Sequence, residues 1–249
     1  MAQPLTPLQH SAPYRRRFIG AFVILSVVLA AAAGGIVALV MGGGHAADTA
    51  WSPWRPSSAA DPSQQIANRV AAAYRLDGGG QLVSVRPGPL QLVDGTPLYI
   101  VVGSPSSSGQ ATFTYVPGNG IVYLMCGLGK DCAIKGKSST TRFMLVRREA
   151  LELALYTFKY TPGVDSVVVL PPTKNAVDNP VALLFRRDAL GRELSQPLST
   201  TLAGTPPTLK KLDRKAIQRV SALTARNVFS ARVESALDGG AFLVLEPVG

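Results

Sequence analysis

One apolar run constrains this chain more than any other feature of its sequence. From Phe18 to Met41 the chain reads FIGAFVILSVVLAAAAGGIVALVM, 24 residues without a charge. About 20 apolar residues cross the hydrocarbon core of a bilayer, so this run is long enough to span it with some tilt. The 249-residue sequence contains no second run of comparable length. We therefore predict a single transmembrane helix over residues 18–41.

The charges beside this run predict its orientation. The triplet Arg15–Arg17 directly precedes it, and the first positive residue that follows is Arg55. Positively charged flanks stay in the cytoplasm, which makes residues 1–17 a cytoplasmic tail and places the chain from Gly42 onward outside. We therefore expect a single-pass cell-membrane protein with an extracytoplasmic C-terminal domain.

A cleaved signal peptide is the alternative explanation of the same segment. Its positive start fits, and Gly44-His45-Ala46 would serve as a cleavage site with small flanking residues. The apolar part of a signal peptide is usually about 7–15 residues long, however, which is well short of this run. The length favours a retained anchor.

Small residues recur within the predicted anchor at a spacing of four. They are Ser26, Ala30, Gly34, Ala38 and Gly42. Small side chains at this spacing let two helix backbones approach closely and pack against each other in a membrane. This candidate packing stripe predicts self-association or a partner helix, although alanine and glycine are also simply common in the segment.

The chain after the anchor divides into a tether and a folded domain. Residues 42–60 are small, polar and interrupted by proline, which predicts a flexible tether. Trp51 and Trp54 lie close behind the anchor, where tryptophan commonly sits among lipid headgroups. Residues 61–249 are then enough for one domain of ordinary size, and the proline-containing connector at 204–212 is a candidate boundary within it.

The hydrophobic pattern of residues 61–249 predicts an α+β domain with a mixed, mostly antiparallel sheet and three or four helices. Asp61 is a suitable cap for the first helix, and Pro117–Gly120 is a strong signal for a hairpin turn. The other expected helices cover 148–159, 187–194 and 214–226. The expected strands are 81–86, 90–93, 98–102, 111–116, 121–126, 142–146, 167–170, 181–185, 228–237 and 241–246.

The chain contains only two cysteines, Cys126 and Cys132. A short polar loop separates them, and a pair at this spacing outside the cytoplasm most simply forms a disulfide that closes the loop. Redox-active pairs are typically spaced C-x-x-C, so we expect a structural bond. Two free thiols are the alternative if the domain is cytoplasmic.

No complete catalytic or metal-binding signature occurs in the sequence, and we expect no cofactor. The only two histidines, His10 and His45, would lie on opposite sides of the membrane, so a zinc site is not expected. Glu149 and Glu152 are one helical turn apart, and their neighbours predict an ordinary solvated face rather than a pair of acid–base carboxylates.

The chain is strongly basic, with a net charge of +10. Without the three arginines of the tail, 22 basic residues face 15 acidic ones, a net charge of +7. An exterior domain of this charge attracts lipid headgroups, anionic envelope polymers or an acidic protein, whereas nucleic acid is not an expected partner outside the cell. One basic cluster follows the disulfide loop: Lys130, Lys135, Lys137, Arg142, Arg147 and Arg148.

A second basic cluster surrounds the start of the predicted helix 214–226. It consists of Lys210, Lys211, Arg214, Lys215 and Arg219. Several of these side chains are spaced to share one helix face, which makes the cluster a candidate surface for an anionic partner. Ordinary solvated surface is the alternative.

Together these features predict a non-enzymatic protein of the bacterial cell envelope. Alanine, valine, glycine and arginine are abundant and lysine is sparse, a bias that points to a GC-rich bacterial genome. We expect the exterior domain to act as a binding or assembly module for a protein partner or an anionic envelope component. The alternative is an envelope hydrolase or transferase whose Asp and Glu residues converge only in the fold.

Overall fold

The computed structural model describes residues 50–58, 61–104, 112–172, 180–202, 204–235 and 239–248. These residues contain one eight-stranded sheet. The predicted tail, the anchor at 18–41 and the stripe from Ser26 to Gly42 lie outside these residues. Among the described helices, none combines the length and apolar character needed to cross a bilayer. The connector at 204–212 belongs to the compact unit Thr49–Gly249.

The sheet is mostly antiparallel, which confirms the predicted α+β class. Five neighbouring strand pairs are antiparallel, and the pairs β4–β5 and β2–β8 are parallel. In sheet order the strands are β1 (Val83–Pro89), β4 (Gly120–Gly127), β5 (Ser166–Leu170), β6 (Val181–Arg186), β7 (Val228–Ser235), β8 (Ala241–Pro247), β2 (Leu98–Ser104) and β3 (Thr112–Tyr115).

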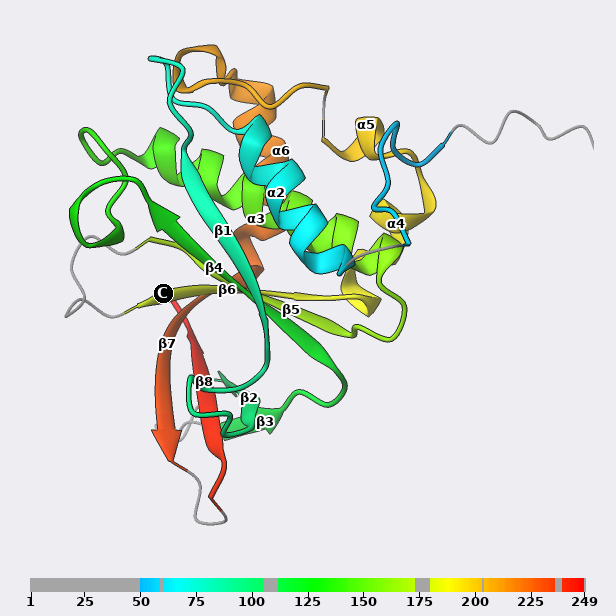
Figure 1. The fold of residues 1–249 in the computed structure, drawn as a ribbon, viewed down its shortest axis with the longest axis vertical. Coiled ribbons are helices and arrows are strands. Elements are labelled where there is room, and N and C mark those ends of the chain that lie inside the picture. Colours follow the sequence, from blue (N-terminus) through cyan, green and yellow to red (C-terminus); the bar gives the residue numbers. More distant parts are fainter. Residues whose placement is uncertain are drawn as a thin grey trace, which may run out of the picture. The chain divides into compact units, whose positions relative to one another are not determined.

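Three long helices lie on one side of the strands (Figure 1). They are α2 (Pro62–Ala73), α3 (Thr140–Tyr160) and α6 (Arg214–Thr224). The predicted cap of α2 is confirmed, because the Asp61 side chain accepts a hydrogen bond from Ser63 N at 2.8 Å. The short elements are α4 (Gly191–Ser195), α5 (Leu198–Thr201) and the 3-10 turns η1 (Lys130–Cys132), η2 (Asp188–Leu190), η3 (Leu209–Lys211) and η4 (Ala225–Asn227).

Helix α3 connects the parallel strands β4 and β5, since parallel neighbours need a long crossover. The prediction of a strand at Arg142–Val146 is wrong, because these residues form the first turns of α3. Ser139 explains the difference: its hydroxyl accepts a hydrogen bond from Arg142 N at 3.2 Å and starts the helix before the strand-like residues.

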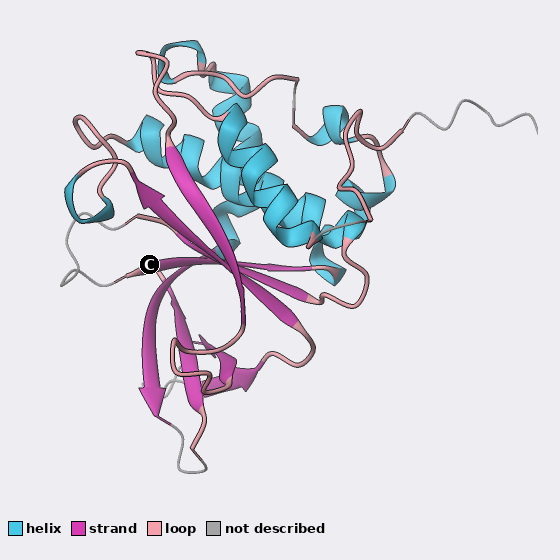
Figure 2. Cartoon of the chain, viewed as in Figure 1, coloured by secondary structure: helices cyan, strands magenta, loops and turns pink. Residues whose placement is uncertain are grey.

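The middle of the sheet has an apolar core on each face. In β5, Val167 and Val169 pack toward the helices, whereas Val168 belongs to a second core. That second core is closed by the strands that curve away from the helices, as Figure 2 shows. Because β5 is buried on both faces, its sequence is a continuous apolar run rather than an alternating one. The second core contains Leu98, Ile100, Val116, Val122, Val168, Ala182, Leu184, Phe229, Ala231, Ala241, Leu243 and Leu245.

A strand prediction and a hairpin prediction are wrong in the segments around β2 and β3. The expected strand 90–93 is a turn before β2, in which Leu92 N donates to Thr96 O at 2.8 Å. The turn Pro117–Gly120 joins β3 to β4 without forming a hairpin, because β3 pairs with β2. Asn119 instead docks on the start of β5, and its carbonyl accepts from Asp165 N at 2.8 Å. The predicted hairpin of β7 and β8 is confirmed.

The described segment 50–58 packs on the domain, although it falls within the predicted tether. Trp51 is only 8% exposed, and its ring lies 5.3 Å from that of Tyr156 and 5.8 Å from that of Tyr160. Ser52 shares a 2.6 Å hydrogen bond with the Tyr156 hydroxyl. The prediction that Trp51 lies among headgroups is therefore wrong, and the folded unit begins before Asp61.

Candidate functional site

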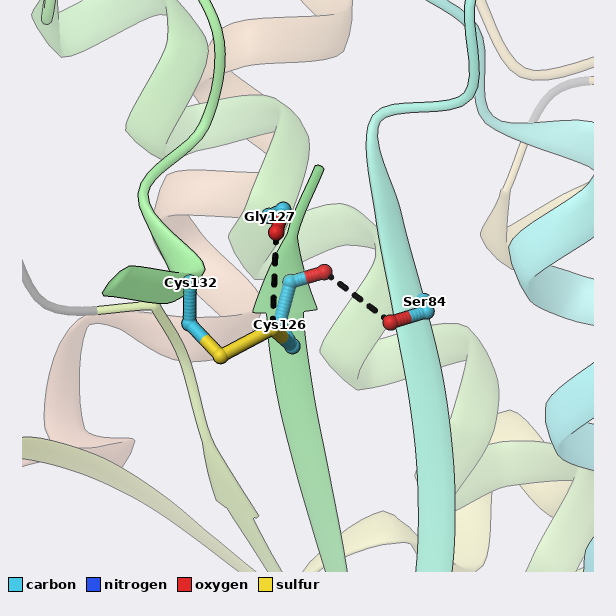
Figure 3. The surroundings of a disulfide bond; sticks show 4 residues. All are labelled: Ser84, Cys126, Gly127 and Cys132. Carbon is cyan, nitrogen blue, oxygen red and sulfur yellow. Dashed lines mark hydrogen bonds between the residues drawn. A yellow bond between two sulfur atoms is a disulfide. The ribbon is translucent and has the colours of Figure 1, made fainter. Parts of the chain in front are cut away.

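The predicted disulfide between Cys126 and Cys132 is present (Figure 3). It ties the end of β4 to the η1 turn, and the carbonyl of Cys126 accepts a hydrogen bond from the Ser84 hydroxyl of β1 at 3.1 Å. Asp131 and Cys132 both have positive φ, 52° and 59°, which is unusual for residues with side chains. The bond therefore closes a tight loop with a constrained backbone.

The basic cluster that follows this loop is divided by the fold. Lys130, Lys135 and Lys137 are exposed. The arginines of α3 turn inward instead: Arg147 Nε donates to the Thr224 hydroxyl of α6 at 2.7 Å, and Arg148 is only 2% exposed. Half of this cluster is therefore part of the internal structure rather than a surface for a partner.

Arg148 belongs to a buried polar network between α2 and α3. Its Nη1 donates to the Tyr74 hydroxyl at 2.6 Å and to Glu152 Oε2 at 3.3 Å. The Tyr74 hydroxyl in turn donates to Glu152 Oε2 at 2.6 Å. Burial raises the pKa of Glu152, while the hydrogen bond from Tyr74 and the charge of Arg148 oppose that rise. The ion pair lies within α3, and the Tyr74 hydroxyl connects it to the end of α2.

Glu149 is fully buried, and neither of its carboxyl oxygens has a hydrogen-bond partner among the described residues. Burial raises the pKa of Glu149 well above its usual range, and the charge of Glu152 adds to the rise. The prediction of a solvated face for these two residues is wrong. Helix α3 packs against α2, α6 and the sheet, so little of its surface remains for solvent.

The two glutamates do not form the open carboxylate pair that a hydrolase needs, because Glu149 is sealed in the core and Glu152 is paired with Arg148. Within the described ranges, no group of three or more His, Cys, Asp or Glu residues could hold a metal ion. Burial of the Glu149 carboxyl favours its neutral form by raising its pKa, and it keeps the group away from solvent.

The second basic cluster remains on the surface. We define the basic surface as Lys210, Lys211, Arg214, Lys215 and Arg219, all of which are exposed. The predicted cap is confirmed here too, because Asp213 Oδ1 accepts from Ala216 N at 2.7 Å and starts α6. The backbone N–H of Lys210 donates to Asp77 at 3.1 Å, which attaches the η3 turn to the loop after α2.

The five cations of the basic surface form no ion pair with a described acid, although Asp213 lies among them in the sequence. Every ion pair found in the described part of the chain involves Arg148, Arg186 or Arg232, and none involves the basic surface. Arg219 makes one polar contact, to the carbonyl of Thr200 at 3.0 Å. The first turn of α6 contains no acidic residue. Arg214 and Lys215 lie in this first turn, at the positive end of the helix dipole, where cations do not help to stabilise the helix.

The sequence predicted the disulfide and the second basic cluster. Its only signal for the buried network was the presence of Arg148, Glu149 and Glu152 in the predicted helix, and that pattern was interpreted as a solvated face. Comparisons with known proteins assign no family to this chain: no family profile matches it, and neither a curated protein nor a solved structure is detectably similar to it.

Proposed function

We propose that this chain is a membrane-anchored, non-enzymatic envelope protein whose extracytoplasmic domain binds a protein partner or an anionic envelope component through the basic surface. One observation carries the proposal. Five exposed cations surround the start of α6 and form no ion pair with any described residue. The predicted anchor would hold this surface close to the membrane.

The position of the cations supports a binding role over a structural one. A positive charge beside the N-terminus of a helix opposes the helix dipole, an effect of about 0.3–1 kcal/mol per charge. Arg214 and Lys215 occupy the first turn of α6. The Asp213 carboxylate already caps the N-terminus of α6, so an anionic partner would pair with the exposed side chains of Arg214 and Lys215 rather than with the helix end.

The alternative of a hydrolase or transferase finds less support. It requires two carboxylates that face a substrate, whereas Glu149 is fully buried and Glu152 is held by Tyr74 and Arg148. A carboxyl that is fully buried cannot exchange protons with a substrate in solution.

Site-specific photo-crosslinking in the native membrane tests the proposal. A photoreactive residue at Lys215 should yield an adduct with an acidic protein or an anionic polymer. Lys137 is a matched control, because it is also an exposed lysine but lies beside the disulfide loop. Equal adducts from both positions, or adducts from position 137 alone, would contradict the assignment of the basic surface.

A reporter fusion tests the topology on which the proposal depends. A reporter that is active only outside the cytoplasm should work when it is fused after Gly249. Activity of a cytoplasm-only reporter at that position would overturn the orientation predicted from the Arg15–Arg17 triplet.

A further inference from the structure

The described sheet ends in two edges, and their sequences differ in a way that bears on association. Strand β1 pairs only with β4, and strand β3 pairs only with β2. A free edge offers unpaired N–H and C=O groups to other strands, and proline or charge on the edge usually blocks such pairing. The β1 edge contains Arg86, Pro87 and Pro89, whereas β3 reads Thr-Phe-Thr-Tyr, without charge or proline. The β3 edge is therefore the one that is open to another strand.

Strand β3 is accessible along its length. All four of its residues are exposed, and it lies away from the three long helices (Figure 1). Val116 N donates to the Ile100 carbonyl of β2 at 2.9 Å, so Thr114, two residues earlier, also directs its N–H and C=O groups toward β2. The N–H and C=O groups of Phe113 and Tyr115 then point to the free edge, where they form no hydrogen bond with a described residue.

Exposed aromatic side chains lie along the same edge. Phe113 is 46% exposed and Tyr115 is 53% exposed, and both lie on the face of the strand opposite Thr114. The ring of Tyr99 on β2 lies 6.3 Å from that of Tyr115. The guanidinium of Arg232 lies 5.9 Å from the Phe113 ring and is ion-paired with two glutamates of the sheet. Grouped apolar side chains in water mark a surface for association, and a strand added at this edge would cover them.

We propose that β3 pairs with β3 of a second copy of this chain, antiparallel and in register about Thr114. A two-fold axis beside Thr114 places each Phe113 opposite Tyr115 of the second copy, and these two pairs exchange four hydrogen bonds. The opposed rings form aromatic pairs of the kind that stabilise antiparallel strands. Because β3 contains no charge, the pairing opposes no like charges on the two strands. The strand is thus complementary to itself, which favours a second copy over a different protein.

The paired strands are short, so the way in which the copies are held matters. A standard interface between soluble proteins buries about 1,200–2,000 Å², which is more than two four-residue strands supply. Copies confined to one membrane meet at a higher effective concentration, so for its strength the pairing rests on the proposed anchor. It uses a different surface from the basic one, which belongs to η3 and α6.

Cysteine crosslinking of the full-length chain in intact cells tests this register. The two native cysteines are bonded to each other, so Thr114→Cys adds one free thiol. In the proposed pair the two residues at 114 face each other with Cα atoms about 4.5 Å apart, which a disulfide can bridge. Mild oxidation should therefore convert most of this variant to a covalent dimer. Thr112→Cys is the matched control: it is an exposed threonine on the same face, but its copies would lie roughly 13 Å apart and should not crosslink.

A second variant tests the hydrogen bonds of the pair. Tyr115→Pro removes a donor that points to the free edge and leaves the hydrogen bonds between β2 and β3 in place. Thr114→Cys/Tyr115→Pro should therefore lose most of the dimer while its unfolding temperature stays close to that of Thr114→Cys.

Three results would overturn the proposal. They are a Thr114→Cys chain that stays monomeric, one that crosslinks only to another protein, and equal dimer yields from positions 112 and 114, because random collisions do not depend on register. The membrane fraction of the same cells reports on the anchor separately. A chain that crosslinks at position 114 but is absent from that fraction would contradict the proposed function and still support the strand pairing.

Discussion

The loop after the disulfide and the start of α6 both carry a run of cations, and the fold uses the two runs differently. In the first run, Arg147 and Arg148 form hydrogen bonds within the domain, to Thr224 of α6 and to Tyr74 at the end of α2. In the second, all five side chains that form the basic surface remain exposed and outside any ion pair among the described residues. A run of cations in the sequence therefore does not show whether its side chains are exposed or buried, and our proposal rests on the exposed and unpaired run.

The different positions of the two helices explain this contrast. Helix α3 is the central helix of its layer and is buried on most of its surface, so its arginines must find acceptors within the protein. Helix α6 buries only Val220 and Thr224 among its residues. Its cations remain in water, where they keep their hydration and are free to meet a partner. Substitutions in the two regions should therefore have opposite effects on stability and binding.

The largest effect is expected at Arg148. An Arg148→Met substitution removes one partner of a buried ion pair and leaves Glu152 with only the Tyr74 hydroxyl. We expect a loss of about 3–5 kcal/mol in the free energy of unfolding. Thermal unfolding can be followed by near-ultraviolet circular dichroism, because both tryptophans of the chain pack on the domain.

Lys211→Met is the matched control for this comparison. The same change at an exposed cation should alter the unfolding free energy by no more than about 0.5 kcal/mol. A small loss from Arg148→Met would show that the buried network contributes little to stability, and it would remove the distinction drawn between the two clusters.

The disulfide should have the next largest effect. A ring of this size stabilises the folded state by about 2–2.5 kcal/mol through the entropy of the unfolded chain. The left-handed backbone of Asp131 and Cys132 is unfavourable and reduces that gain. A Cys126→Ser/Cys132→Ser variant should therefore lose somewhat less than the entropic value. A larger loss would mean that the loop also supports packing elsewhere.

Glu149 should make stability depend on pH. Its pKa is raised in the folded state, so the folded protein holds a proton that the unfolded chain releases above about pH 4.3. Stability from this group is thus fully present below that pH and decreases as the pH rises, by up to about tenfold in the unfolding equilibrium constant per pH unit.

Glu149→Gln removes this titration. The variant should gain stability relative to the native chain as the pH is raised from 4.5 to 8, while Glu152→Gln, which replaces a carboxyl whose pKa is raised less, should lose the ion pair with Arg148 and show a smaller gain with pH. Unfolding temperatures across this range measure both. A difference between native chain and variant that does not change with pH would show that Glu149 is ionised in the fold.

Local signals predicted much of the fold. Asp61 and Asp213 cap the helices that they were expected to start, the β7–β8 hairpin forms, and the two cysteines are bonded. These features depend on residues close together in the sequence. The Ser139 cap is also a local feature, but the strand-like residues after it led to the wrong prediction of a strand at 142–146.

The predictions for Trp51 and Glu149 were wrong because their environments depend on contacts between distant segments of the chain. The environment of Trp51 is set by Tyr156 and Tyr160, more than 100 positions away along the chain. Glu149 is buried because α2, α6 and the sheet pack around α3. This packing involves segments far apart in the sequence, so the residues near Glu149 do not reveal it.

The smallest effect on stability is expected at the basic surface. Lys211→Glu/Lys215→Glu changes the local charge by four units at exposed positions. The unfolding free energy should stay within about 0.5 kcal/mol of the native value, and acids near the start of α6 should offset any loss through the helix dipole. A marked destabilisation would show that the lysines have a structural role after all.

The most direct measurement compares the binding of the full-length chain to fluorescent poly-glutamate at 0.15 M and 1 M salt, for the native chain and two charge-reversed variants. The Debye length falls from about 8 Å to about 3 Å over this range, so binding by the native chain should weaken. Lys211→Glu/Lys215→Glu should weaken binding at 0.15 M by about tenfold or more, whereas Lys130→Glu/Lys137→Glu, an equal change of charge beside the disulfide, should leave it close to native. Equal losses from both variants would show that net charge, and not the basic surface, attracts the anion.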